Sequence, residues 1–65
     1  MKIWITRDQV GTLLGFDEKP YLVEDPFFNF KLWTTKNGQV VNFREELFPE
    51  VTFENSPKEV EIKLL

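Results

Sequence analysis

Hydrophobic and polar residues alternate at the start of the chain, which predicts a strand over residues 2–6 with Ile3 and Ile5 on the same side. Residues 8–11 read Asp-Gln-Val-Gly, and this glycine can adopt positive φ after a type I turn. A return strand is expected over residues 12–16. The chain therefore begins with a tight antiparallel hairpin.

The longest alternating run predicts a strand over residues 27–35, and another strand is predicted over residues 39–43. Asn37 and Gly38 lie between the two. An Asn-Gly pair in this position is the strongest short-range hairpin signal, because both residue types tolerate the positive φ of a type I′ turn. We therefore expect these two strands to pair with each other.

The segment between Pro20 and Pro26 reads Tyr-Leu-Val-Glu-Asp and is apolar at its start. Proline lacks the N–H group that a strand inside a sheet donates, so two nearby prolines argue against a central strand. An edge segment or an ordered loop is expected here.

Two segments have the form of a capping box. Asn42 followed by Glu45 predicts a short helical turn near residues 43–48, which a following proline ends. Residues 56–59 read Ser-Pro-Lys-Glu and would also start a helix, whereas residues 60–64 alternate strictly. We favour a strand at the C-terminus, paired with the first strand.

These elements predict a mainly β fold: a small, mostly antiparallel, five-stranded curled sheet or open barrel with one short helical turn near residues 43–48. The expected core is Ile3, Ile5, Leu14, Phe16, Phe28, Phe30, Leu32, Val41, Phe43, Val60, Ile62 and Leu64. Trp4, Leu13, Phe27 and Trp33 then fall on the opposite face. They are either covered by a second small core of Leu47, Phe48, Val51 and Phe53, or Trp4 and Trp33 stay partly exposed and mark a partner site.

Length and composition exclude several functions. The 65 residues suffice for a single small domain over residues 1–65. The chain contains no cysteine and no histidine, which excludes disulfides, thiolate metal sites and histidine-based catalysis. Neither a nucleophile motif nor a glycine-rich phosphate loop is present. We therefore expect no enzymatic activity, no cofactor and no metal site.

Charge and hydropathy bear on the partner and the location. The 8 basic residues are scattered among 11 acidic ones, with a formal net charge of −3. Nucleic-acid binders usually carry a basic cluster, so a nucleic-acid partner is disfavoured. No stretch reaches the ~20 apolar residues of a membrane span, and no signal peptide is recognised. A cytoplasmic location without a membrane partner is expected.

Acidic and aromatic residues are the candidates for partner binding. Four acids fall between positions 17 and 25, and Trp33 belongs to the next predicted strand. Aromatic residues anchor protein interfaces, and charges at the rim steer the encounter, so a basic protein surface is the expected partner. The candidate site residues are Trp4, Trp33, Phe27, Asp17, Glu18, Glu24 and Asp25.

Both ends of the chain resemble a group of short uncharacterised proteins of gut Bacteroides-type bacteria and their phages or prophages. The resemblance rests on Lys-Ile-Trp-Ile-Thr-Arg-Asp at residues 2–8 with Gly11 and Lys19-Pro20, on residues 47–57, and on Glu-Val-Glu at residues 59–61. No activity is assigned to the group, so no site residue is implied. The resemblance implies a mobile-element setting, in which short acidic proteins commonly bind a host protein.

The sequence therefore favours a non-enzymatic protein-interaction module, an accessory protein of a phage or prophage that binds a host protein. A structural or self-assembling component is one alternative. Single-stranded nucleic-acid binding through Trp4, Phe27 and Trp33 on an aromatic face is another.

Overall fold

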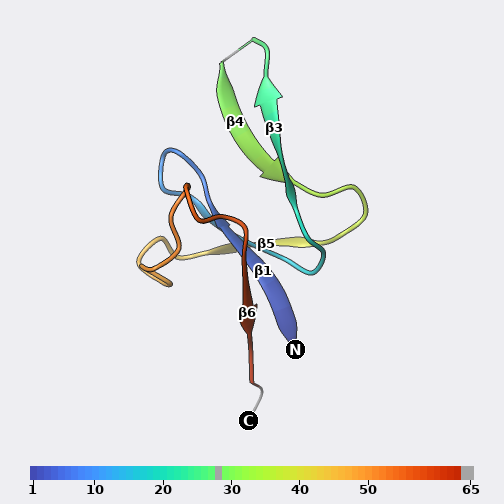
Figure 1. Cartoon of the computed structure of the whole chain (residues 1–65), viewed down its shortest axis with the longest axis vertical. Helices are drawn as coiled ribbons and strands as arrows, with labels where there is room; N and C mark the ends of the chain where they lie inside the picture. The colour runs from blue at the N-terminus through green and yellow to red at the C-terminus, as the bar shows by residue number, and fades with distance from the viewer. Residues whose placement is uncertain (28, 64–65) are drawn as a thin grey trace.

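In the computed structural model, residues 1–27 and 29–63 are described. These residues form six strands, which are β1 (Lys2–Arg7), β2 (Leu13–Phe16), β3 (Tyr21–Asp25), β4 (Phe30–Thr34), β5 (Val40–Phe43) and β6 (Lys58–Glu61). One sheet has the strand order β5-β2-β1-β6, and β3 pairs with β4 in a second sheet (Figure 1). All these pairs are antiparallel, which confirms a mainly β, antiparallel fold.

The first hairpin is confirmed, together with its turn. The Asp8 carboxylate accepts hydrogen bonds from the N–H groups of Val10 at 3.0 Å and Thr12 at 2.9 Å. Gly11 has a φ of 99°, a conformation that glycine adopts without strain. The local sequence is therefore sufficient to turn β1 into β2.

The C-terminal segment forms a strand, not a helix. β6 pairs with β1 and places Val60 opposite Ile3, so the predicted neighbour is also confirmed. The N–H of Ile62 donates to the carbonyl of Met1 at 2.7 Å, which brings these two ends of the described chain together. Leu64, the last residue of the predicted alternation, lies outside the described residues.

The predicted hairpin at Asn37-Gly38 is wrong. β4 pairs with β3, and β5 pairs with β2. Among the described residues with positive φ, neither Asn37 nor Gly38 is found, so no type I′ turn forms. Residues 35–39 instead link the two sheets, and the Asp17 carboxylate accepts a hydrogen bond from the N–H of Gln39 at 2.8 Å. This bond holds the chain where it crosses from one sheet to the other.

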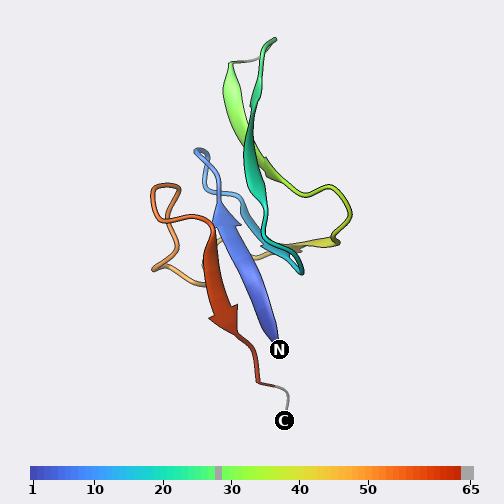
Figure 2. The same cartoon turned by 45° about the vertical axis from the view of Figure 1, so that its right-hand side comes forward.

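β3 is a sixth strand and pairs only with β4, so this segment forms the edge strand that was one of the two predicted alternatives, and the loop did not form. The prediction of one five-stranded curled sheet or open barrel is therefore wrong in strand number, and the two sheets do not close. β3 and β4 extend together beyond the four-stranded sheet, and we call this pair the arm (Figures 1 and 2). The arm contributes to an elongated shape of 44 × 26 × 17 Å. Phe28, predicted as a core residue next to β4, lies outside the described residues.

The helical turn predicted near residues 43–48 is also wrong, because the described residues contain no helix. Residues 44–56 form successive turns, the first of which is closed by a 3.0 Å hydrogen bond from the N–H of Leu47 to the carbonyl of Arg44. Carbonyl groups that a helix would use internally accept hydrogen bonds from the guanidinium of Arg7. These bonds to a distant side chain replace the helical ladder.

The core lies between the four-stranded sheet and these turns. Ile5 is opposite Gly15 in the β1–β2 pair, so Leu13 shares the face of Ile5. Ile5, Leu13 and Val51 are fully buried in one cluster, against which Phe48 packs. The prediction that Leu13 lies on the face opposite Ile5 is therefore wrong.

The other face of the four-stranded sheet is also covered. Trp4 is opposite Phe16 and Thr6 is opposite Leu14, so these four side chains share a face. Phe16 and Thr6 are buried there. The prediction grouped Leu14 and Phe16 with Ile5, which is wrong because the observed register places them on opposite faces.

Candidate interaction site

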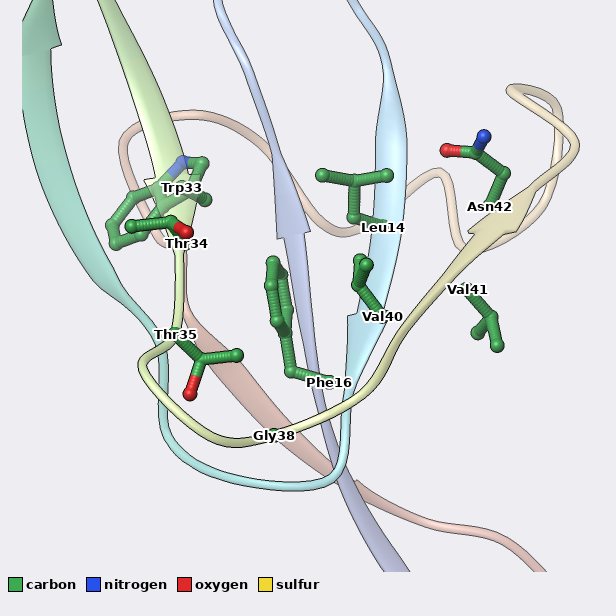
Figure 3. Close-up of a pocket in the computed structure, with 9 residues that line it drawn as sticks. All are labelled: Leu14, Phe16, Trp33, Thr34, Thr35, Gly38, Val40, Val41 and Asn42. Atoms are coloured by element: carbon green, nitrogen blue, oxygen red, sulfur yellow. The ribbon is translucent and has the colours of Figure 1, made fainter.

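Trp33 lies in a cleft of about 260 Å³ between the arm and the four-stranded sheet. The indole is half-buried, and its centroid lies 6.3 Å from that of the Phe53 ring, with 60° between the ring planes. Figure 3 shows the Phe16 ring reaching into the cleft and Val41 pointing away from it. The indole N–H (Nε1) is buried and has no hydrogen-bond partner among the described residues. Trp33 therefore connects the arm to the turns of residues 44–56 and forms a wall of the cleft.

Trp4 is half-buried on β1, where Phe16 is its cross-strand neighbour. The ammonium group of Lys19 lies 5.5 Å from the centroid of the Trp4 ring, within the range of a cation–π contact. The sequence left two interpretations of Trp4 and Trp33: burial under a second small core, or partial exposure at a partner site. The observed intermediate burial falls between the two. Neither ring is fully covered, and neither is free of protein contacts.

Phe27 lies at the tip of the arm and is 90% exposed. Its N–H donates to the Asp25 carboxylate at 2.8 Å, and the N–H of Asn29 donates to the Asp25 carbonyl at 2.9 Å. Asn29 has a φ of 56°, which asparagine tolerates in such a turn. Phe27 is therefore separated along the arm from Trp33, which lies near the base.

The four candidate acids form two separate pairs. Asp17 and Glu18 lie at the base of the arm, where Glu18 accepts a hydrogen bond from the Thr35 hydroxyl at 3.3 Å. Glu24 and Asp25 lie at the other end of β3. The five residues of β3 span about 16 Å, which is longer than the Debye length at physiological salt. The structure therefore does not bring the four carboxylates into one rim.

An exposed apolar surface of the arm is formed by residues that were not among the predicted site residues. The β3–β4 register places Tyr21, Val23, Phe30 and Leu32 on one face, and all four side chains are exposed. We call these four residues the arm face. The alternation in each strand is visible in the sequence, but only the pairing of β3 with β4 joins the two halves into one surface.

A groove continues the arm face toward the turn of the first hairpin. It encloses about 330 Å³ and is mainly apolar, with Val10 on one side and Phe30 and Leu32 on the other. Its remaining lining residues are Asp8, Gln9 and Lys31. The arm face and this groove offer one continuous area for a partner side chain to enter.

Among the described residues, no group of three or more acidic side chains is arranged to hold a metal ion. The described part of the chain also lacks any helix long and apolar enough to cross a membrane. Comparisons with protein-family models, with curated proteins and with solved structures found no match.

Proposed function

We propose that this chain is a non-enzymatic protein-interaction module and that its partner docks on the arm face. The proposal rests on the exposed apolar row of Tyr21, Val23, Phe30 and Leu32 on a projecting two-stranded sheet. A two-stranded sheet by itself is marginally stable, and an additional strand or an apolar cover stabilises it. Contiguous exposed apolar patches often mark sites of protein–protein contact.

The proposed partner is a host protein with a basic surface, and the proposed setting is a phage or prophage whose accessory protein acts in the host cytoplasm. The resemblance of both chain ends to phage- and prophage-associated proteins supports this setting. The net charge of −3, with Glu24 and Asp25 near the arm tip, supports a basic partner. Charges beside an apolar anchor accelerate the encounter with a surface of opposite sign.

Photo-crosslinking from the arm face tests this proposal. A photoreactive residue in place of Val23 is expected to give a discrete adduct in a lysate of Bacteroides-type cells. The matched control carries the same residue at Leu47, which is 43% exposed against 41% for Val23 but lies in the turns after β5. Leu32→Lys, made opposite Val23, should abolish the Val23 adduct, because docking would bury an unpaired charge.

The same adduct from both positions, or an adduct that survives Leu32→Lys, would contradict docking on the arm face. A crosslink between two copies through Val23 would support the self-assembling alternative instead. A crosslink to single-stranded nucleic acid would support the aromatic-face hypothesis.

A further inference from the structure

The outer edge of β5 lacks the features that normally prevent sheet edges from pairing. β5 is an edge strand and reads Val-Val-Asn-Phe. Edge strands present unpaired N–H and C=O groups, and proteins usually protect them with charged side chains, proline or bulges. The opposite edge, β6, carries two glutamates and a lysine in four residues, whereas Val40 and Val41 are 54% and 53% exposed. β5 is therefore the edge to which another strand can add.

Backbone geometry restricts how β5 can pair with a second copy of itself. In an antiparallel pair, two opposed residues both direct their N–H and C=O groups toward the other strand, or both away from it. The direction of these backbone groups alternates from one residue to the next. In a two-fold symmetric pair, the axis must therefore pass between one residue and the same residue of the second copy. Centring on Val41 places the two Val41 side chains opposite each other and Val40 opposite Asn42 of the second copy.

The charges at the two ends of β5 are complementary in this register. Arg44 of one copy would lie opposite Gly38 of the other. A Cβ atom on Gly38 would be 2.5 Å from Asp17 Oδ1 and 3.2 Å from Glu18 Cγ, so both acidic side chains lie beside this position. Among the described residues, neither carboxylate forms an ion pair, and the Arg44 side chain is 82% exposed and paired with Glu46.

We propose that β5 pairs antiparallel with β5 of a second copy, centred on Val41, so that the two four-stranded sheets become one continuous sheet. We assign a second copy as the partner because β5 can pair with itself in this register. In that pairing, Asp17 and Glu18 of one copy lie beside Arg44 of the other. β5 has four residues, so the contact falls below the roughly 1,200 Å² of a stable interface and should dissociate at micromolar concentrations.

This proposal goes beyond the proposed function, since it uses a different surface. The arm belongs to the other sheet and is not part of the β5 pairing. A dimer would present two arm faces, and two linked sites can bind a repetitive or dimeric partner more tightly than either alone.

Sedimentation equilibrium of the whole chain, from micromolar to millimolar concentration, tests the pairing. Val41→Lys should raise the dimer Kd at least about tenfold, because two ammonium groups would then meet across the two-fold axis. Val23→Lys, on a comparably exposed valine of the arm face, should change the Kd by less than about twofold. A wild-type chain that stays monomeric at millimolar concentration, or equal effects of the two variants, would overturn the proposal.

Amide hydrogen exchange on the wild-type chain gives a readout that does not depend on the folding of a variant. Amides of β5 should become more protected as concentration rises, while those of β6 should not. Protection that rises on β6 or on the arm instead would assign the contact to another strand and overturn the proposal.

A charge swap tests the register itself. Arg44→Glu and Glu18→Lys should each raise the Kd at least about threefold, because each places like charges beside one another. An equimolar mixture of the two variants should associate more tightly than either alone, since the new carboxylate of one chain meets the new ammonium group of the other. A mixture no tighter than its components would show that these ends do not meet.

Because Leu32→Lys alters only the arm face and Val41→Lys only the β5 edge, the two proposals fail separately. Loss of the host-protein adduct without a change in the dimer Kd would show that the variant affects docking on the arm face and leaves the β5 pairing intact. Loss of the dimer with an unchanged adduct would show that the variant affects the β5 pairing and leaves docking on the arm face intact.

Discussion

Replacing Arg7 should release the turns after β5 from the sheet. A guanidinium has five N–H donors in a fixed plane, and in this protein all five are used by backbone carbonyls. Nε donates to Val51 at 2.6 Å, Nη1 to Gly11 at 2.9 Å and Glu45 at 3.0 Å, and Nη2 to Leu47 at 2.9 Å and Phe48 at 3.1 Å. One side chain therefore joins the first hairpin to the segment that covers the core.

The loss in free energy of unfolding on replacing Arg7 depends on how deeply these hydrogen bonds are buried. Those to Val51, Gly11 and Phe48 are partly buried, whereas water can replace the other two. A hydrogen bond from a charged donor contributes about 1.5–3 kcal/mol, and bonds made by one side chain do not add in full, so Arg7→Met should lower the free energy of unfolding by about 4–6 kcal/mol. Arg7→Lys keeps the charge but loses the planar fork, and about 2–3 kcal/mol is expected. A chain of this length has about 3–10 kcal/mol in total, so the methionine variant should lose a large part of its stability.

Urea unfolding followed by tryptophan fluorescence measures these losses. The matched control is Arg44→Lys, which alters an exposed arginine whose ion pair with Glu46 contributes little. It should change the free energy of unfolding by less than about 0.5 kcal/mol. Amide exchange at Leu47 and Val51 should accelerate in Arg7→Lys and stay unchanged in the control.

A loss below about 1 kcal/mol for Arg7→Lys would refute the reasoning, because it would mean that the fork contributes less than a single charged hydrogen bond. Equal losses for the two lysine variants would lead to the same conclusion. Either result would assign the position of the turns to the packing of Val51 and Phe48 alone.

Substitutions at three further positions test the link between the sheets and the cleft. Gly38→Ala should cost about 1–2 kcal/mol in urea unfolding, because its Cβ displaces the Asp17 carboxylate from the N–H of Gln39; no loss would mean that the link relaxes freely. Asn37→Ala should change stability by less than about 0.5 kcal/mol, whereas a larger loss would indicate the type I′ turn. Trp33→Phe should stay within about 1 kcal/mol of the wild type by calorimetry, because it removes an unpaired N–H, while Trp33→Ala should cost about 3–4 kcal/mol. Similar losses for the two Trp33 variants would indicate that the indole N–H has a partner.

The sequence alone determines elements that depend on neighbouring residues or on a clear two-residue period. The first hairpin needs only an Asp8 side chain that reaches the next backbone N–H groups and a glycine at position 11. The strict alternation around Val60 predicted a strand in competition with a capping box, and the strand formed. In both cases the deciding interactions are local or follow from a two-residue period.

The partners of the middle strands were decided by tertiary contacts. Asn37-Gly38 has the composition of a hairpin turn, yet Asp17 binds the next residue, Gln39, and the missing Cβ of Gly38 leaves room for that carboxylate. The prolines at 20 and 26 stand outside β3 and do not interrupt it. Composition could not reveal this, because proline disfavours a strand only where its N–H is needed.

The same limit applies to the candidate site. The sequence suggested Trp33 and the acidic residues as candidates, but it placed four carboxylates together that a strand of about 16 Å separates. Register decided that Leu13 and not Leu14 is fully buried, because a shift of one residue moves every side chain to the other face. In the sequence, Arg7 is one of several scattered basic residues. Its role in holding the turns depends on folding, which brings the carbonyls of residues 45–51 to its guanidinium. Backbone carbonyls exist at every position of a chain, so no sequence pattern marks the five that a distant arginine will bind.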